Sequence, residues 1–261
     1  MGLMIGQRAE ACGLFTPEHI RLSRVRPERR KVVEAALPDS QILSDNAAAV
    51  RDAELVVLAV KPKSFAIVAD EIRDHLPKGA LVVSLVTGVS LERLGSQLGV
   101  ENVVRASTNI GIESGVATTY WIAGPDVAPG SRERTIEIVR SWGDEVECND
   151  ETLLDIAIVG VGCGPALVIE FIQALTRAMV TQGMPHDLAE RGILSLLRGT
   201  LALRAAAADR PLSQFQQEVI TPGGITAEAL LAMEEGKFRA TVINAFRKAH
   251  DKVSNLAPPK G

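Results

Sequence analysis

The pattern of apolar and polar residues divides the chain into two parts of different character. From residue 20 to about 149, unbroken apolar runs alternate with segments that have apolar residues at helical spacing. The clearest runs are residues 55–60 and 80–86, and the helical segment between them covers residues 64–76. Continuous apolar runs of this kind suit strands that are buried on both faces of a parallel sheet. The alternation therefore predicts a doubly wound α/β sheet.

After about residue 150 the strand pattern stops and only helical patterns follow. Four such segments are separated by turns that contain Gly or Pro: residues 165–181, 187–208, 226–235 and 238–255. The first of them is apolar on nearly all sides, which in a soluble protein implies burial against another helix layer or another subunit. We therefore expect residues 151–261 to form an all-α dimerisation and substrate domain.

The N-terminal part of the pattern begins one element later than such a sheet requires. Residues 1–12 have a helical pattern, and the short strand at residues 20–23 follows them. In a dinucleotide-binding unit, a first strand and a Gly-rich turn precede that helix and place the pyrophosphate on its N-terminus. We expect residues 1–150 to form an N-terminally truncated, Rossmann-like dinucleotide-binding domain with an incomplete sheet. The strand beside the gap should have an exposed edge.

Composition narrows the function class. The formal net charge of −4 argues against binding to nucleic acid or to an anionic membrane surface. Cys12, Cys148 and Cys163 are far apart and lack metal-ligand spacing, so we predict no metal site and a reduced, cytoplasmic protein. The N-terminus lacks the order of a signal peptide. The most apolar stretch, residues 165–180, is interrupted by charges and is shorter than the ~20 residues of a membrane span.

Three segments at strand ends are candidates for contacts to a dinucleotide. Ser23-Arg24 ends the strand at which an acidic residue would bind the ribose of NAD, whereas an Arg accommodates the 2′-phosphate of NADP. This favours NADP over NAD, and the alternative is a solvated, basic helix start. Residues 59–62 and Thr87-Gly88 end two buried strands at the edge where open α/β sheets bind ligands. For the former, an ordinary surface turn is the alternative.

A candidate anion site precedes the third helical segment of the second part. There, residues 221–226 read Thr-Pro-Gly-Gly-Ile-Thr. Two glycines let backbone N–H groups turn inward, the helix N-terminus adds positive potential, and the Thr226 hydroxyl is a further donor. Such a site fits a carboxylate or a phosphate. The alternative is a helix-capping turn with Thr226 as the N-cap.

A second glycine cluster, residues 160–165, precedes the apolar helix. Glycines before a Pro in the first helical turn are common in helix capping, and close approach of the backbone to a ligand is the functional alternative. Cys163 would serve as a nucleophile only beside a base, and no His lies near it in the sequence.

Together these motifs resemble the pyrroline-5-carboxylate reductase family over nearly the whole chain. The matching segments, in chain order, are the helix start with Asn46, residues 59–62, residues 83–94, Arg105 with Asn109, and residues 159–166, 183–185, 221–230 and 234–246. The resemblance implies a Rossmann domain joined to an all-α dimerisation domain. It also implies NADPH-dependent reduction of the C=N bond of a cyclic imino acid, in proline biosynthesis or on a related imine, by a homodimer or a higher oligomer.

The resemblance also implies three sets of site residues. The expected catalytic residues are Thr226, Asn109 and Cys163. The expected substrate-binding residues are Gly223, Gly224, Thr226 and Gly164. The expected cofactor-binding residues are Gly2, Ser23, Arg24, Asn46, Ala59, Val60, Lys61, Pro62, Thr87 and Gly88.

Departures from the family pattern gather where the substrate is expected. They fall at residues 107–111 and 162–167, at Gln173 and at Ile225. Three hypotheses follow. The first is an NADPH-dependent oxidoreductase acting on CH–NH or C=N groups, an imine reductase for proline-like or larger, less polar cyclic imines. Its nicotinamide binding should be weakened because the first strand is lost, and its turnover of pyrroline-5-carboxylate itself should be poor. The second is a diverged homologue that uses no nicotinamide and acts as a dimeric binding protein or a redox-neutral catalyst on a related small carboxylate. The third is that the sequence as given begins downstream of the natural start.

Overall fold

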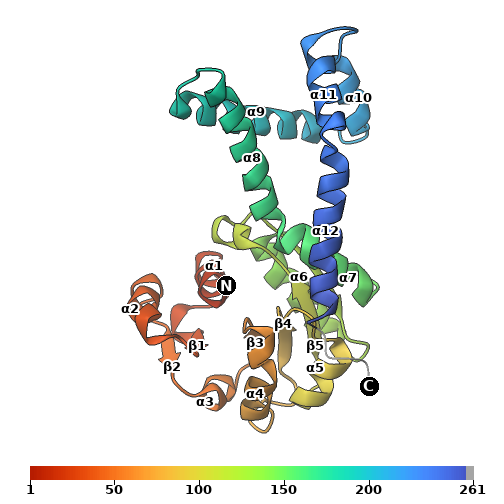
Figure 1. Ribbon diagram of the computed structural model, residues 1–261. Coiled ribbons are helices and arrows are strands. Elements are labelled where there is room, and N and C mark those ends of the chain that lie inside the picture. The colour runs from red at the N-terminus through yellow and green to blue at the C-terminus, as the bar shows by residue number, and fades with distance from the viewer. Residues whose placement is uncertain (257–261) are drawn as a thin grey trace. The chain divides into compact units, whose positions relative to one another are not determined.

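The computed structural model describes residues 1–256, which fold into two compact units (Figure 1). Of the described residues, unit 1 comprises Met1–Gly164 together with residues 249–256, and unit 2 comprises Pro165–Lys248. The division falls inside the region expected to be helical, and the expected domain boundary near residue 150 stays a prediction. The last five residues of the expected all-α domain lie outside the described part.

Unit 1 contains the predicted α/β sheet, now seen in two pieces. A short parallel sheet pairs β1 (Arg21–Ser23) with β2 (Gln41–Leu43). A larger sheet has the order β3-β4-β5-β6-β7, in which only β5 and β6 are antiparallel neighbours. Its strands are β3 (Leu55–Leu58), β4 (Leu81–Ser84), β5 (Val103–Ser107), β6 (Ala117–Ala123) and β7 (Gly143–Glu147). The expected fold class is confirmed.

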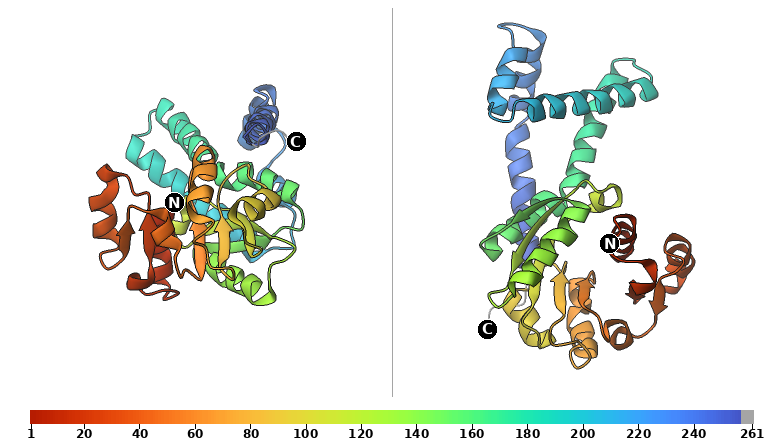
Figure 2. Two further views of the ribbon diagram at one scale, coloured as in Figure 1. Left: turned by 90° about the horizontal axis from the view of Figure 1, so that it is seen from below. Right: turned by 180° about the vertical axis from the view of Figure 1, so that it is seen from behind.

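Among the described residues, no hydrogen-bonded ladder joins the two sheets. β1 pairs only with β2, and β3 pairs only with β4. The two sheets are seen apart in Figure 1 and in the right-hand view of Figure 2. In a doubly wound sheet the first strand lies between these two. The break is thus where the sequence pattern predicts it. Helix α1 (Gly2–Ala11) packs instead on α6 (Pro129–Trp142) and on the short turn η2 (Ile110–Ser114).

The remaining helices of unit 1 cover the larger sheet and flank the smaller one. They are η1 (Pro17–His19), α2 (Pro27–Ala36), α3 (Asn46–Val50), α4 (Pro62–Ile72), α5 (Leu91–Leu98) and α7 (Glu151–Ala157), which runs into the π-helical turn η3 (Ile158–Gly162). Helix α4 begins two residues before the predicted start because Pro62 occupies its first turn, where a missing N–H costs nothing.

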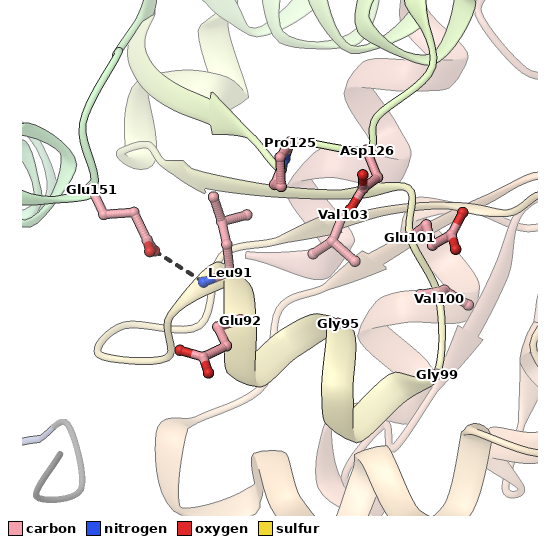
Figure 3. Close-up of a pocket in the computed structure, with 11 residues that line it drawn as sticks. Leu91, Glu92, Gly95, Gly99, Val100, Glu101, Val103, Pro125, Asp126 and Glu151 are labelled. Carbon is pink, nitrogen blue, oxygen red and sulfur yellow. Dashed lines mark hydrogen bonds between the residues drawn. The ribbon is translucent and has the colours of Figure 1, made fainter. Parts of the chain in front are cut away.

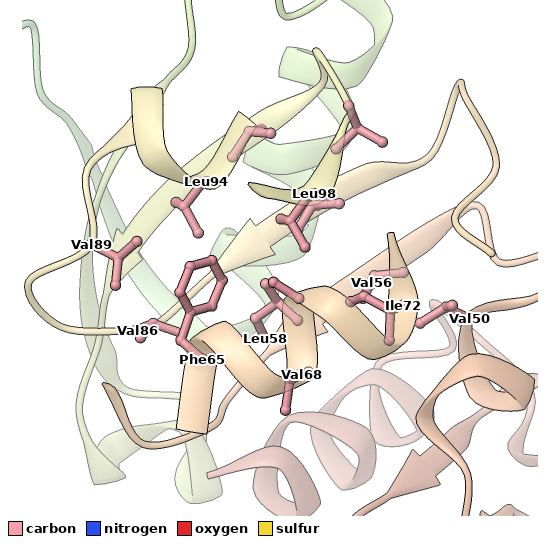
Figure 4. Packing of buried hydrophobic residues seen from close by; sticks show 14 residues of the cluster. Val50, Val56, Leu58, Phe65, Val68, Ile72, Val86, Val89, Leu94 and Leu98 are labelled. Carbon is pink, nitrogen blue, oxygen red and sulfur yellow. The ribbon is translucent and has the colours of Figure 1, made fainter. Parts of the chain in front are cut away.

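Two apolar cores explain why the strands of the larger sheet are apolar throughout. Alternate residues of a strand point to opposite faces. Val82 of β4 belongs to a core that α4 and α5 cover, whereas its neighbour Val83 belongs to the core around Trp121 and Trp142 on the other face. In the first core Phe65, which is 1% exposed, faces α5 (Figure 4). A doubly covered strand therefore shows no alternation.

Unit 2 is helical throughout its described length, as the pattern predicts. Its helices are α8 (Gly164–Thr181), α9 (His186–Ala206), α10 (Leu212–Val219), α11 (Ile225–Glu235) and α12 (Phe238–Ser254), the last of which ends in unit 1. The rings of Phe171 and Phe238 lie 5.8 Å apart between centroids. Few side chains of this unit are buried by the chain itself.

The apolar helix α8 begins at Gly164, so residues 160–165 lie at its start as expected, after the π-helical turn η3. The helical residues Glu151–Thr181 are together long and apolar enough to cross a membrane, as are some core helices of soluble proteins. Thr176 is the one buried residue of α8, so the chain itself buries little of this helix. The exposed apolar side chains of this helix therefore indicate contact with another molecule.

Candidate functional site

The start of α1 lies against the end of β3 in unit 1. A Cβ atom built on Gly2 would be 3.8 Å from Cβ of Ala59, so the helix start and the loop after β3 are in contact. Met1 provides no side-chain cap, which leaves the first N–H groups of α1 able to bind an anion. Burial, followed by the positive charges of Lys61 and Arg29, lowers the pKa of the Met1 amino group. This cradle fits a phosphate group.

The loops after β3 and β4 form the adjacent edge of the sheet. Lys61 is the N-cap of α4 with extended backbone, and its side chain makes no capping hydrogen bond. Gly88 has φ +74°, a conformation that favours glycine over other residues. Because β3 and β4 are parallel neighbours, residues 59–62 and Thr87-Gly88 leave the sheet at the same edge. The structure thus brings these predicted residues together.

Arg24 and Asn46, two of the predicted cofactor-binding residues, are joined by a side chain that sequence reasoning missed. Glu71, in α4, accepts from Nη2 of Arg24 through Oε1 at 2.8 Å, and from Nδ2 of Asn46 through Oε2. Arg24 directly follows Ser23, the last residue of β1. Glu71 gave no signal in the sequence, since it lies beside Asp70 among the polar residues of an ordinary amphipathic helix.

Asn109 and the glycine cluster lie close together in unit 1. Oδ1 of Asn109 accepts from the backbone N–H of Gly111 at 2.8 Å and so caps η2. A Cβ atom on Gly162 would be 3.8 Å from Oγ of Ser107 and from the carbonyl oxygen of Thr108. Cys163, the next residue, is exposed. The catalytic roles expected for Asn109 and Cys163 stay predictions.

A charge cluster around the buried Arg105 holds the helix that leads to the glycine cluster. Arg105 of β5 is 5% exposed and pairs with Glu151 and with Oδ1 of Asp155, the latter at 2.7 Å. Glu151 also accepts from the N–H of Leu91, the first residue of α5, at 3.0 Å (Figure 3). The cluster therefore ties β5 and α5 to α7, whose last residue leads directly into η3.

The hollow in Figure 3 is not the predicted site. It lies beside α5 and the β6–α6 loop, and it contains none of the predicted site residues. Its four charged lining residues are all acidic: Glu92, Glu101, Asp126 and Glu151. These carboxylates would repel the phosphates of a dinucleotide and the carboxylate of an imino acid.

The predicted anion site of unit 2 has the expected backbone geometry. Gly223 has φ +65°, a backbone conformation that favours glycine, and a Cβ atom on Gly224 would lie 2.1 Å from Oγ1 of Thr221, so Thr221 would have to move to admit it. The N-cap of α11 is Gly224, not Thr226, which corrects the capping alternative. Gly224 makes no side-chain cap, and Thr226 lies in the first turn with its backbone N–H still unpaired within the helix.

Two family profiles match the chain. One is described as pyrroline-5-carboxylate reductase dimerisation and matches residues 151–256, and the other, described as NADP oxidoreductase coenzyme F420-dependent, matches residues 1–88. The pyrroline-5-carboxylate reductase of Synechocystis sp. is 31% identical over 246 residues, which are 93% of this chain and 89% of that protein. The chain belongs to the pyrroline-5-carboxylate reductase family. The reductase of Escherichia coli is 33% identical over 207 residues, 78% of this chain and 76% of that protein.

Solved structures of pyrroline-5-carboxylate reductases have the same fold. The enzyme of Plasmodium falciparum, with NADP bound, matches with a TM-score of 0.87 at 24% identity and covers 98% of this chain and 94% of that one. The enzyme of Streptococcus pyogenes matches with a TM-score of 0.86 at 22% identity, over 98% and 96% of the two chains. The predicted family and fold are both confirmed.

Proposed function

We propose that this chain is an NADPH-dependent reductase of the C=N bond of pyrroline-5-carboxylate, which yields proline. The observation that carries the proposal is the 31% identity to the Synechocystis reductase over 89% of that protein. The comparisons lend no support to the alternative of a homologue that no longer uses a nicotinamide. The retained helix starts of α1 and α11 support the same function, since both suit the anionic groups of its ligands.

The start of α11 is proposed to hold the substrate carboxylate. Gly223 and Gly224 present backbone N–H groups, the helix dipole adds positive potential, and the Thr226 hydroxyl is a further donor. One fixed carboxylate leaves a five-membered ring few orientations. Orienting the C=N bond in this way lowers the entropic part of the barrier.

Residues of unit 1 are proposed to hold the dinucleotide. The start of α1 at Gly2, with Lys61, suits the diphosphate, and Arg24 with Asn46 suits the substituted ribose. The loops at residues 59–62 and 87–88 would border the nicotinamide. When bound, the nicotinamide supplies a hydride to the imine carbon. The chain's own contribution is to bind and orient the two ligands.

We also propose that the dinucleotide binds less tightly than to a Rossmann domain with a continuous sheet. The basis is the break between β1 and β3, beside the start of α1. A missing backbone donor to a charged phosphate weakens binding by about 1.5–3 kcal/mol.

A homodimer in the cytoplasm completes the proposal. The chain carries the dimerisation domain of its family, and α8 exposes apolar side chains that a second copy would cover: Leu167, Val168, Ile169 and Phe171. Covering by a partner subunit explains the long apolar stretch at 151–181 without a membrane.

A steady-state assay with NADPH and pyrroline-5-carboxylate tests the function. We expect substrate-dependent NADPH oxidation, and we expect Thr226→Val to raise KM for the imino acid roughly tenfold through loss of one donor to a charged group. Thr241→Val, at an exposed position of α12, is the matched control and should leave KM unchanged. Equal KM values in the two variants would show that Thr226 does not contact the substrate. Absence of any turnover of pyrroline-5-carboxylate would refute the function.

A further inference from the structure

The carboxylate of Glu71 engages the two residues proposed to bind the substituted ribose. Its Oε1 lies 2.8 Å from Nη2 of Arg24, and its Oε2 accepts from Nδ2 of Asn46. Asn46 is 6% exposed and so is firmly placed. The side chains of Arg24 and Glu71 are 39% and 41% exposed. Their ion pair is therefore weak and can open toward a stronger partner.

Arg24 has an unusual backbone conformation. Its φ of +52° is uncommon for a residue other than glycine, Asn or Asp. Arg24 follows the last residue of β1, and Glu71 lies near the end of α4. The Arg24–Glu71 pair is thus one of the links between β1 and α4.

The two nicotinamide cofactors differ at the group that would meet this pair. The 2′-phosphate of NADPH accepts hydrogen bonds from an Arg guanidinium, often two at once, and repels a nearby carboxylate. The 2′-hydroxyl of NADH donates a hydrogen bond to a carboxylate instead. The Glu71 carboxylate thus disfavours binding of NADPH and favours binding of NADH.

We propose that Glu71 is a positioning residue that sets the cofactor preference of this reductase through Arg24. With Glu71 ionised, Arg24 is held in the ion pair, and the 2′-phosphate must displace the carboxylate to reach the guanidinium. The preference for NADPH is therefore smaller than the presence of Arg24 alone predicts. This inference rests on the proposed function, because it assumes that a dinucleotide binds at unit 1.

The test measures dissociation constants of 2′,5′-ADP, 5′-ADP, NADPH and NADH by calorimetry for the full chain and for Glu71→Gln. Removing one negative charge and freeing Arg24 should tighten binding of the two 2′-phosphorylated ligands roughly tenfold. Binding of 5′-ADP and NADH should stay the same or weaken. Glu137→Gln, which removes an exposed Arg–Glu pair on α6, is the matched control and should change no affinity. In the Arg24→Gln background, Glu71→Gln should lose most of its effect.

The outcomes separate this inference from the proposed function. If the unchanged chain binds none of the nucleotides, the proposed function fails. If it binds them and Glu71→Gln leaves the ratio of the NADPH and NADH constants unchanged, this inference alone is overturned. Thermal unfolding shows whether the variant is folded. If it is not, Glu71→Asp, whose shorter side chain cannot span both partners, should shift the same ratio in the same direction.

Discussion

At the start of α11 the backbone itself is the expected ligand-binding group. A Cβ atom on Gly224 would lie 2.1 Å from Oγ1 of Thr221 and 3.0 Å from its carbonyl oxygen, so Gly224→Ala must move the turn. We expect KM for pyrroline-5-carboxylate to rise at least roughly tenfold, as one donor to a charged group is displaced. The dissociation constant of NADPH, measured by fluorescence titration, should be unchanged. An unchanged KM would place the carboxylate elsewhere.

Among the three cysteines, Cys148 should be the one that the folded chain protects from alkylation. Burial raises its pKa, and the negative charges of Glu147 and Asp150 raise it further, whereas Cys12 and Cys163 are exposed. Below the raised pKa the thiolate fraction of Cys148 is smaller than that of a free thiol, and the difference disappears as the pH rises above it. Mass spectrometry after iodoacetamide treatment at pH 8 should find Cys148 the slowest to react. Unfolded in urea, the chain should react at all three cysteines at similar rates.

Single residues were predictable where a backbone rule selects them. Gly223, Gly224 and Gly88 stand out because turns and helix starts require glycine, and each has the expected geometry. Glu71 was not predictable, because only the fold brings α4 beside the end of β1. The capping alternative placed the N-cap of α11 two positions too late, at Thr226, because Gly224 occupies it instead.

Arg105 is the side chain that holds three elements together. It is buried, and its carboxylate partners Glu151 and Asp155 are about one-third exposed, so its removal leaves two acidic groups beside each other with only partial hydration. We expect Arg105→Met to lower the free energy of unfolding by about 2–3 kcal/mol, somewhat less than for a fully buried pair. Arg132→Met, which breaks the more exposed pair with Glu147, should cost under about 1 kcal/mol. Urea denaturation measures both, and equal costs would contradict the role of Arg105.

Among the elements, the strands and most helices were predictable and the junction at residues 151–164 was not. An apolar strand such as β4 is recognisable because both of its faces are covered. The glycines and Pro165 of the second cluster lie where α8 begins, as expected, but the π-helical turn η3 before it was not predicted. A π turn of this kind leaves no periodic signal in the sequence.

At the scale of the whole molecule, the exposed apolar face of α8 predicts the assembly. Val168 is 55% exposed in the single chain, and a charge there would be buried without a partner in a dimer. Sedimentation should find the unchanged chain as a dimer or a larger species, and Val168→Glu should shift it toward the monomer. Val116→Glu, at a loop position of unit 1 that is 74% exposed, is the control and should leave the oligomeric state unchanged. A monomeric unchanged chain would refute the proposed interface.

The central claim is that this chain transfers a hydride from NADPH to the imine carbon of pyrroline-5-carboxylate. The most direct measurement supplies the chain with NADPH that carries deuterium at the transferred position and analyses the product by mass spectrometry. The account predicts proline with one deuterium on the ring carbon that was double-bonded to nitrogen, in an amount equal to the cofactor oxidised. Proline without deuterium, or no proline while NADPH stays reduced, would contradict it.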